Sequence, residues 1–232
     1  MDVIIVAKTH MHNAVCIGGI LANGRFVRLL DKYGHNQNVN TSMNVGDVYA
    51  VFFDEKEDKR PPHIEDIIVS KMKLKFSFSP IEKMIEYLSL NLKLKIWRGS
   101  TEIVFDGKIK WTQSGSGYIS ESSEIPDNSV GFWIPDKPLT KRDYQGKVKY
   151  DYPPINPVKT NFTVEQQWRS LPFVGFQSPV DIIPAGTLVR LSLARWWSPK
   201  DSDVEERCYL QISGWYGLPE PGMTDKCEDL PY

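Results

Sequence analysis

The sequence predicts a mainly β protein built from two small barrels with a single helix. Three observations point to this fold class. Most apolar runs alternate in the strand period of two, and the sixteen prolines and sixteen glycines lie mostly between those runs, as they do in proteins of many short strands. One segment repeats apolar residues at helical spacing over about three turns, and residues 163–171 are a further candidate for a short helix. No run approaches the roughly 18 continuous apolar residues that a membrane helix needs.

The first barrel is expected to start at the amino terminus. Asn23-Gly24 separates two apolar runs, and both residues tolerate the positive φ angles of a tight hairpin. Residues 32–44 are rich in Gly, Asn and Ser and predict a surface loop. The strands expected in this part are residues 2–9, 14–21, 25–30, 48–53 and 64–78.

One helix is predicted over residues 80–92. Ser79 is a suitable cap, Pro80 fits the first helical position, and Glu82 completes a capping box. An apolar stripe of about three turns follows. It consists of Ile81, Met84, Ile85, Leu88 and Leu92.

Strands and turns are expected again after the helix, over residues 102–111, 130–134, 147–152, 188–197 and 208–216. A strand-rich chain with a lone helix fits a barrel that the helix plugs at one end, as in the five-stranded OB fold. The proline cluster at 152–157 predicts a stiff linker. We therefore expect a first OB-like barrel at 1–150, including the helix, and a second at 151–232 with an irregular acidic tail.

The charge is unevenly distributed although its sum is near zero. The formal net charge is −1, yet residues 71–110 carry nine basic and four acidic side chains, and residues 198–232 carry three basic and eight acidic ones. Such a separation steers a polyanion to one side of a protein, and it also arises where charges simply face water. Both interpretations stay open.

The cysteines and the amino terminus predict a cytoplasmic protein. Cys16, Cys208 and Cys227 are too few and too scattered for a disulfide framework or a thiolate zinc site. The first residues form a short apolar run without a basic leader, which favours a strand over a secretory signal.

The most informative stretch lies near the carboxyl end, in the predicted strands 188–197 and 208–216. One face of these strands would bury Val, Leu and Ile side chains. Aromatic rings with arginine on the opposite face are typical of surfaces that bind a flat or anionic ligand. The alternative is that the tryptophans fill a core or the contact between two barrels. The residues expected to bind here are Arg190, Arg195, Trp196, Tyr209, Gln211 and Trp215, beside Ser192.

A second anion site is possible on the first hairpin. Arg28 lies between Val27 and Leu29 in an apolar run, so it either pairs with an acid or contacts phosphate. The acids nearest in sequence are Asp31 and Asp47. Arg25 on the same strand and Lys8 on the neighbouring strand would complete the phosphate site.

The sequence favours binding over catalysis. His10 and His12 would share one side of an extended strand, a spacing that suits a metal, with a third ligand from His35, Asp31 or His63. Two such histidines are more often polar surface, so we expect no metal and no cofactor. Cys16 lies in an apolar strand, where a thiolate nucleophile is disfavoured. Walker, G-x-G-x-x-G and G-x-S-x-G motifs are absent, and no catalytic residues are assigned.

Two stretches resemble the bacterial dual-OB-domain family. The first runs from Val6-Ala7-Lys8-Thr9 through Cys16-Ile17-Gly18-Gly19-Ile20 and Gly24-Arg25-Phe26-Val27-Arg28-Leu29-Leu30 to Val45-Gly46-Asp47-Val48-Tyr49. The second joins Leu193-Ala194-Arg195-Trp196-Trp197 to Cys208-Tyr209-Leu210-Gln211-Ile212-Ser213-Gly214-Trp215-Tyr216. The resemblance implies two OB-type barrels, an association with bacterial conflict or phage-defence loci, and a role in binding nucleic acid or sensing a nucleotide. It supplies no catalytic residues.

The expected function is therefore a non-enzymatic module that binds single-stranded nucleic acid or a nucleotide, with no membrane partner. One alternative is a metal-dependent hydrolase or nuclease that uses His10 and His12. Another is a subunit of a larger complex whose exposed aromatic residues dock a protein.

Overall fold

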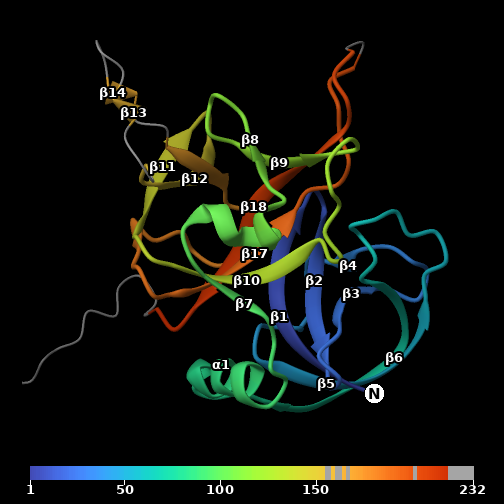
Figure 1. Ribbon diagram of the computed structural model, residues 1–232. Coiled ribbons are helices and arrows are strands. Elements are labelled where there is room, and N and C mark those ends of the chain that lie inside the picture. The colour runs from blue at the N-terminus through green and yellow to red at the C-terminus, as the bar shows by residue number, and fades with distance from the viewer. Residues whose placement is uncertain (155–157, 160–163, 166–167, 201–202, 219–232) are drawn as a thin grey trace, which may run out of the picture.

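The computed structural model describes residues 1–154, 158–159, 164–165, 168–200 and 203–218. It confirms the predicted fold class, because strands dominate and form two β units that are consistent with OB-like domains. The two units lie side by side, and β1 and β18 meet near the middle of the molecule (Figure 1). Among the described residues, no helix has the length and apolar character needed to cross a membrane.

The first unit is a closed barrel of five strands. β1 pairs antiparallel with β2 and with β5, β2 with β3, and β5 with β6, while β3 and β6 run parallel and close the ring. Short β4 pairs with the start of β2. The strands are β1 (Asp2–Met11), β2 (Ala14–Leu21), β3 (Phe26–Leu30), β4 (Gln37–Asn38), β5 (Asp47–Glu55) and β6 (Asp66–Ser77).

Local sequence explains the hairpin and the apolar strands. Gly24 has φ +85° in the turn between β2 and β3, as the Asn-Gly pair predicts. Val3 and Ile5 of β1 point into the barrel, whereas Ile4 and Val6 point outward and are also buried. Both faces of β1 are therefore covered, which accounts for its continuous apolar run.

The helix α1 (Ile81–Leu90) follows the barrel and packs on its outside. Pro80 is the N-cap residue and no side chain caps the helix, so the predicted capping box does not form. Met84 and Leu88 pack against the outer face of β1 and against Phe132 of the second unit. The sequence predicts that the helix plugs one end of the barrel, whereas its buried residues belong to the cluster outside the barrel and none of them joins the interior cluster.

The second unit contains two sheets. The larger has the order β7-β10-β17-β18-β9-β8, with β7 and β10 parallel, and the smaller has the order β15-β12-β11-β16. The 3-10 segment Thr101–Gly107 follows β7. The strands are β7 (Ile96–Gly99), β8 (Lys110–Trp111), β9 (Gly117–Ser120), β10 (Val130–Pro135), β11 (Leu139–Tyr144), β12 (Lys147–Tyr152), β15 (Arg169–Pro172), β16 (Ile182–Ile183), β17 (Leu188–Leu193) and β18 (Arg207–Tyr216), with β13 (Val158–Lys159) and β14 (Val164–Glu165) paired separately.

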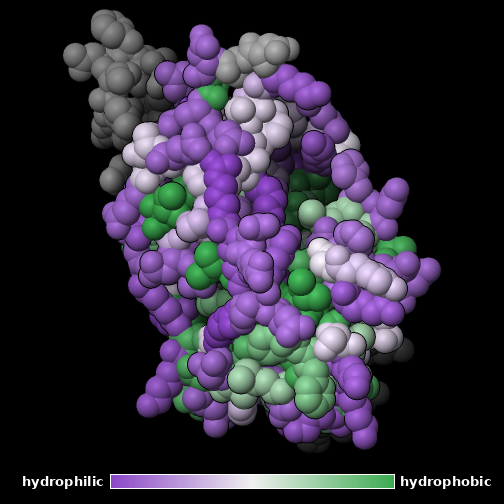
Figure 2. Space-filling view, turned by 90° about the vertical axis from the view of Figure 1, so that its right-hand side faces the viewer, coloured by the Kyte–Doolittle hydropathy of each residue, from purple (hydrophilic) through white to green (hydrophobic). Residues whose placement is uncertain are grey.

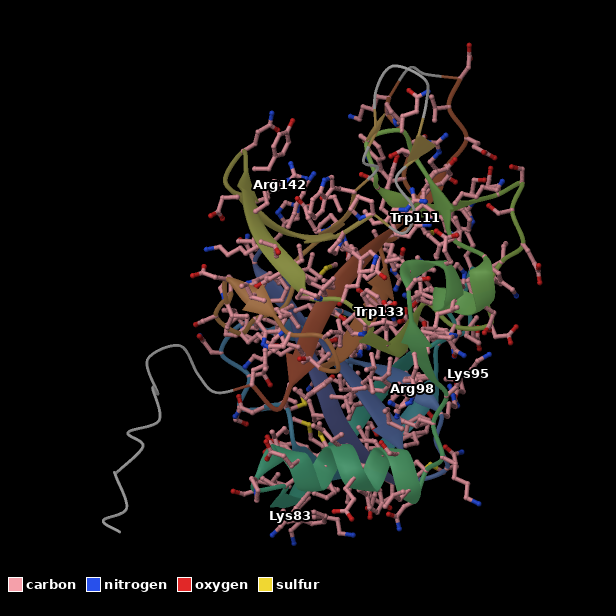
Figure 3. The ribbon with its side chains drawn as sticks, turned by 60° about the vertical axis from the view of Figure 1, so that its left-hand side comes forward. Lys83, Lys95, Arg98, Trp111, Trp133 and Arg142 are labelled. Carbon is pink, nitrogen blue, oxygen red and sulfur yellow. The ribbon has the colours of Figure 1, made fainter. Side chains whose placement is uncertain are left out.

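One core lies within these two sheets. Trp133 is fully buried at its centre and donates its Nε1 hydrogen to the Gly99 carbonyl at 2.9 Å (Figure 3). Strands on both sides of residue 150 belong to this unit, because β10 pairs with β17 and β12 with β15. The proline cluster thus connects two strands of one sheet, and we propose that the division between the units lies near α1.

The basic residues of segment 71–110 are spread over several elements. Three lysines lie on β6, Lys83 lies on α1, and Lys95 and Arg98 lie at β7 (Figure 3). Hydrophilic residues cover most of the face that carries β3 and β6 (Figure 2). Several of the basic side chains form ion pairs, namely Lys75 with Asp2, Lys95 with Asp106, and Lys108 with Glu124.

Candidate anion-binding cleft

A cleft of about 300 Å³ lies where the two units meet. Its first wall comes from the end of β1, from β2 and β3, and from the start of β6. Its second wall comes from β10, β17 and β18. The barrel strands in chain order are β1, β2, β3, β5 and β6, and the first wall contains the second and third of them, β2 and β3. It also contains residues at the ends of the β1–β2 loop and of the β5–β6 loop. OB folds bind their ligands on this face.

Arg190 of β17 is the central cation of the cleft. Its side chain is 5% exposed, and Nη1 donates to Ser213 Oγ at 2.8 Å. Its Nε is buried without a hydrogen-bond partner. Within the described part of the chain, no Asp or Glu forms an ion pair with Arg190. A buried guanidinium without a carboxylate is costly, and an anionic ligand would remove that cost.

The two carboxylates of the cleft are engaged elsewhere. Asp66 holds Arg28 through two hydrogen bonds of 2.5 and 2.6 Å and Arg195 at 3.1 Å. Glu65 accepts hydrogen bonds from Ser129, at 2.6 Å from the backbone N–H and at 2.9 Å from the hydroxyl. Burial raises the pKa of Glu65, although the nearby charge of Arg190 opposes that shift. Glu65 is therefore a neighbour of Arg190 that forms no direct ion pair with it.

Gly18 makes room for the guanidinium. A Cβ at this position of β2 would lie 2.7 Å from Nη2 and 3.2 Å from Cζ of Arg190. Any side chain at residue 18 would therefore displace the arginine head from the cleft wall. The close approach of Arg190 from the other unit thus explains why β2 has a glycine at residue 18.

The loop between β5 and β6 fastens the two units together beside the cleft. Arg60 forms ion pairs with Glu206 at 2.7 Å and with Glu121, and its guanidinium lies 4.7 Å from the ring centroid of Trp196. The Trp196 indole N–H donates to the Pro61 carbonyl at 2.8 Å. We call this set of contacts the loop latch.

His63 belongs to the same loop and is buried. Its Nε2 lies 3.0 Å from the Ala194 carbonyl and 3.6 Å from Cys208 Sγ. Burial lowers the pKa of His63 to about 4 and raises the pKa of Cys208 to about 12. Both groups are therefore neutral near pH 7, so this Cys–His contact does not supply a thiolate nucleophile.

The buried His63 predicts a loss of stability in acid. The unfolded chain takes up the His63 proton as the pH falls through 6.5, whereas the folded chain does so only near pH 4. Between these values protonation favours the unfolded chain, so lowering the pH from 7 to 4.5 should cost about 2–3 kcal/mol of unfolding free energy through His63. Urea denaturation at several pH values measures this. The raised pKa of Glu65 has the opposite effect, because protonation of Glu65 favours the folded chain as the pH falls.

The His63→Gln variant isolates that contribution. It should lose less stability between pH 7 and 4.5 than the unsubstituted protein, by the same 2–3 kcal/mol. His35→Gln is the matched control, because the His35 side chain is 78% exposed. Equal acid losses in His63→Gln and in the unsubstituted protein would contradict this prediction.

Four of the residues predicted to bind a ligand line the cleft: Arg28, Arg190, Arg195 and Gln211. Arg28 pairs with Asp66 and with neither of the two acids nearest in sequence. Their binding roles stay predictions, but the fold brings all four to one place.

The other predicted binding residues lie elsewhere. Lys8 donates to the Thr41 carbonyl at 3.1 Å and lies over the Phe176 ring. Arg25 forms an exposed ion pair with Glu55 at 2.6 Å. Trp196 is half-buried in the loop latch, and Tyr209 lies on the outer face of β18.

The predicted exposure of Trp215 is wrong. The register of β17 and β18 shifts so that Arg190 faces Gly214 and Leu191 faces Ile212, which leaves Ser213 as an extra residue. This β-bulge reverses the alternation beyond it. Trp215 is therefore 6% exposed and lies in the core of the second unit.

The histidine pair predicted to hold a metal is separated by a turn. β1 ends at Met11, and His12 has φ +46° in the turn that follows, so His12 does not share a strand face with His10. His10 stacks on Phe176 at 4.6 Å. No group of three or more His, Cys, Asp or Glu in the described residues is arranged to hold a metal ion.

Sequence reasoning missed Glu65, Asp66 and Ser129, and it named His63 only as a possible metal ligand. Asp66 directly precedes the apolar residues Ile67, Ile68 and Val69. An acid at the start of an apolar strand could have indicated this site, because a buried carboxylate needs a cationic partner.

Two comparisons with known proteins give no match, since no curated protein and no solved structure corresponds to this chain. A comparison with family models gives one. The dual OB-containing domain, DuOB, matches residues 1–215, a range that includes both β units and the cleft between them. The chain therefore belongs to the dual OB-containing domain family.

Proposed function

We propose that this protein is a nucleotide- or nucleic-acid-binding module that holds a phosphate group in the cleft between its two units. The observation that carries the proposal is Arg190, a buried cation in the cleft that forms no direct ion pair with a carboxylate of the described chain and whose nearest recorded acid, Glu65, is hydrogen-bonded to Ser129. The phosphate of a nucleotide is an anion of the right charge, and guanidinium binds phosphate through paired hydrogen bonds.

The position and size of the cleft support a nucleotide as ligand. The cleft lies on the face that OB folds use for oligonucleotides, and family membership is consistent with this use. Its volume of about 300 Å³ falls at the lower end of the range of small-ligand pockets, about 300–1,000 Å³. Residues of the second unit form the other wall of the cleft, and at this volume the cleft suits one nucleotide unit. That such a module serves bacterial defence is a prediction from the family resemblance.

Arg190→Met tests the proposal by calorimetric titration with AMP, GMP, CMP and UMP. We expect at least one of these to bind, adenosine to bind far more weakly than AMP, and Arg190→Met to weaken nucleotide binding about tenfold or more. That factor follows from the 1.5–3 kcal/mol, roughly, of a hydrogen bond to a charged group. Arg190→Lys should keep part of the affinity.

Thermal unfolding separates a binding effect from a folding effect. Methionine removes an unpaired buried charge, so Arg190→Met should be as stable as the unsubstituted protein or more stable. Arg142→Met is the matched control, because Arg142 pairs with Asp151 on the smaller sheet and should leave affinity unchanged. If Arg190→Met binds nucleotides normally, or if none of the four nucleotides binds at millimolar concentration, the proposal is wrong.

A further inference from the structure

A row of aromatic and basic side chains lies on the outer face of the second unit. Tyr209 of β18 faces Tyr118 of β9, and Tyr118 faces Lys110 of β8. Trp197 forms a bridge with Arg207, two residues before Tyr209 on the same strand face. We call these five residues, Lys110, Tyr118, Trp197, Arg207 and Tyr209, the stacking strip.

The rings of the stacking strip are neighbours. The ring centroid of Tyr209 lies 6.1 Å from that of Tyr118 and 6.3 Å from that of Trp197. Trp197 is 55% exposed, and Tyr118 and Tyr209 are half-buried. Large aromatic side chains on the solvent side of a sheet provide flat surfaces on which nucleobases stack.

The strip also carries cations for a phosphodiester backbone. The Arg207 guanidinium lies 4.2 Å from the Tyr118 ring centroid, and its Nε is buried without a hydrogen-bond partner. Lys110 is exposed at the other end of the row. Aromatic platforms interleaved with basic side chains are the arrangement that binds single strands without sequence preference.

The strip is continuous with the cleft. Gln211 is two residues beyond Tyr209 on β18, so the two side chains share one face. Gln211 lies opposite Ser192 of the neighbouring strand β17, and both residues line the cleft. A ligand held at Arg190 therefore meets Tyr209 and Tyr118 next along this face.

Two acidic residues lie beside the stacking strip. Glu205 and Glu206 lie at the start of β18, and Glu206 is neutralised by Arg60. Glu205 is exposed and accepts a hydrogen bond from the Ser122 backbone. Hydrogen bonds from Ser122 and Ser120 lower the pKa of Glu205, and the nearby charge of Lys110 adds to this effect. Glu205 therefore offsets part of the Lys110 charge, and Arg207 is the main cation of the stacking strip.

We propose that the stacking strip binds the bases that follow the nucleotide held in the cleft, so that the ligand is a single-stranded oligonucleotide. This inference rests on the proposed function. It favours nucleic acid over a protein partner because the strip combines aromatic rings with Arg207, which forms no ion pair within the described residues, and continues from an anion site.

Fluorescence anisotropy with the octanucleotides U8 and dT8, beside calorimetry with UMP and dTMP, tests the inference. The unsubstituted protein should bind at least one octanucleotide more tightly than its mononucleotide. Trp197→Ala and Tyr209→Ala should each weaken octanucleotide binding by about fivefold to 150-fold, the loss of one stacked base, and leave mononucleotide binding unchanged. Tyr209→Phe should keep the affinity because it keeps the ring.

Tyr144→Ala is the matched control. Tyr144 is 46% exposed and lies beside Arg142 and Lys149, so it has the same chemistry on a sheet that does not line the cleft. It should bind the octanucleotides normally. Two results would overturn the proposed role of the stacking strip and leave the cleft proposal intact. One is normal octanucleotide binding by both Trp197→Ala and Tyr209→Ala, and the other is an octanucleotide affinity no higher than the mononucleotide affinity in the unsubstituted protein. Absence of mononucleotide binding to the unsubstituted protein would overturn the cleft proposal instead.

Discussion

Trp215→Ala is expected to destabilise the protein by about 3–5 kcal/mol, the usual cost of truncating a buried aromatic side chain. The Trp215 ring lies 4.8 Å from that of Phe173 and 5.4 Å from that of Tyr150. Alanine would leave a cavity between the two sheets of the second unit, and their packed side chains cannot close it fully. Urea denaturation followed by circular dichroism measures the loss.

Trp197→Ala is the matched control for this prediction. Trp197 is 55% exposed, so its truncation should cost less than about 1 kcal/mol. Trp215 lies near the end of β18 and Trp197 lies opposite its first residue, so the two variants remove the same side chain from sites that differ in burial. A Trp215→Ala variant as stable as Trp197→Ala would contradict the placement of Trp215 in the core.

The first barrel was largely predictable from the sequence. Alternating runs, the Asn23-Gly24 turn and the polar loop after β3 place most of its strands within a few residues of the observed ones. The position of the helix was not predictable, because an apolar stripe indicates that a helix packs but not which surface it packs on. That surface, between the barrel and Phe132, exists only after the second unit has formed.

The alternation of strand residues predicts only part of the candidate site. The alternation of β18 correctly places Tyr209 and Gln211 on one face, and then fails for Trp215 because of the bulge at Ser213. Sequence alone does not mark that extra residue. The alternation also ends before Trp196, because β17 ends at Leu193. Trp196 is half-buried, Trp197 is the more exposed ring, and a binding role for Trp196 stays a prediction.

The sequence also could not predict which strands pair when they are far apart in the chain. Arg28 and Asp66 are partners because β3 and β6 run parallel with these two residues in register. Parallel neighbours are far apart in the chain, so the acids nearest in sequence were the natural but incorrect expectation. The same pairing brings Asp66 into the cleft and makes it the shared partner of cations from both units.

Asp66→Ala is expected to destabilise the protein by about 3–5 kcal/mol, because removing one partner of a buried ion pair leaves the other charge uncompensated. The Asp66 side chain is 5% exposed and neutralises Arg28 of the first unit and Arg195 of the second, with Lys56 at 3.8 Å. Denaturant titration at neutral pH measures the loss.

Asp151→Ala is the control for a carboxylate paired at the surface. Its partner Arg142 is 45% exposed, so this variant should lose about 1 kcal/mol or less. The double variant Arg28→Met with Asp66→Leu should recover much of the stability that Asp66→Ala loses, since apolar side chains of similar volume replace a buried pair at little cost. If Asp66→Ala and Asp151→Ala prove equally stable, Asp66 does not hold the two units together, and the cleft has a different electrostatic balance from the one described here.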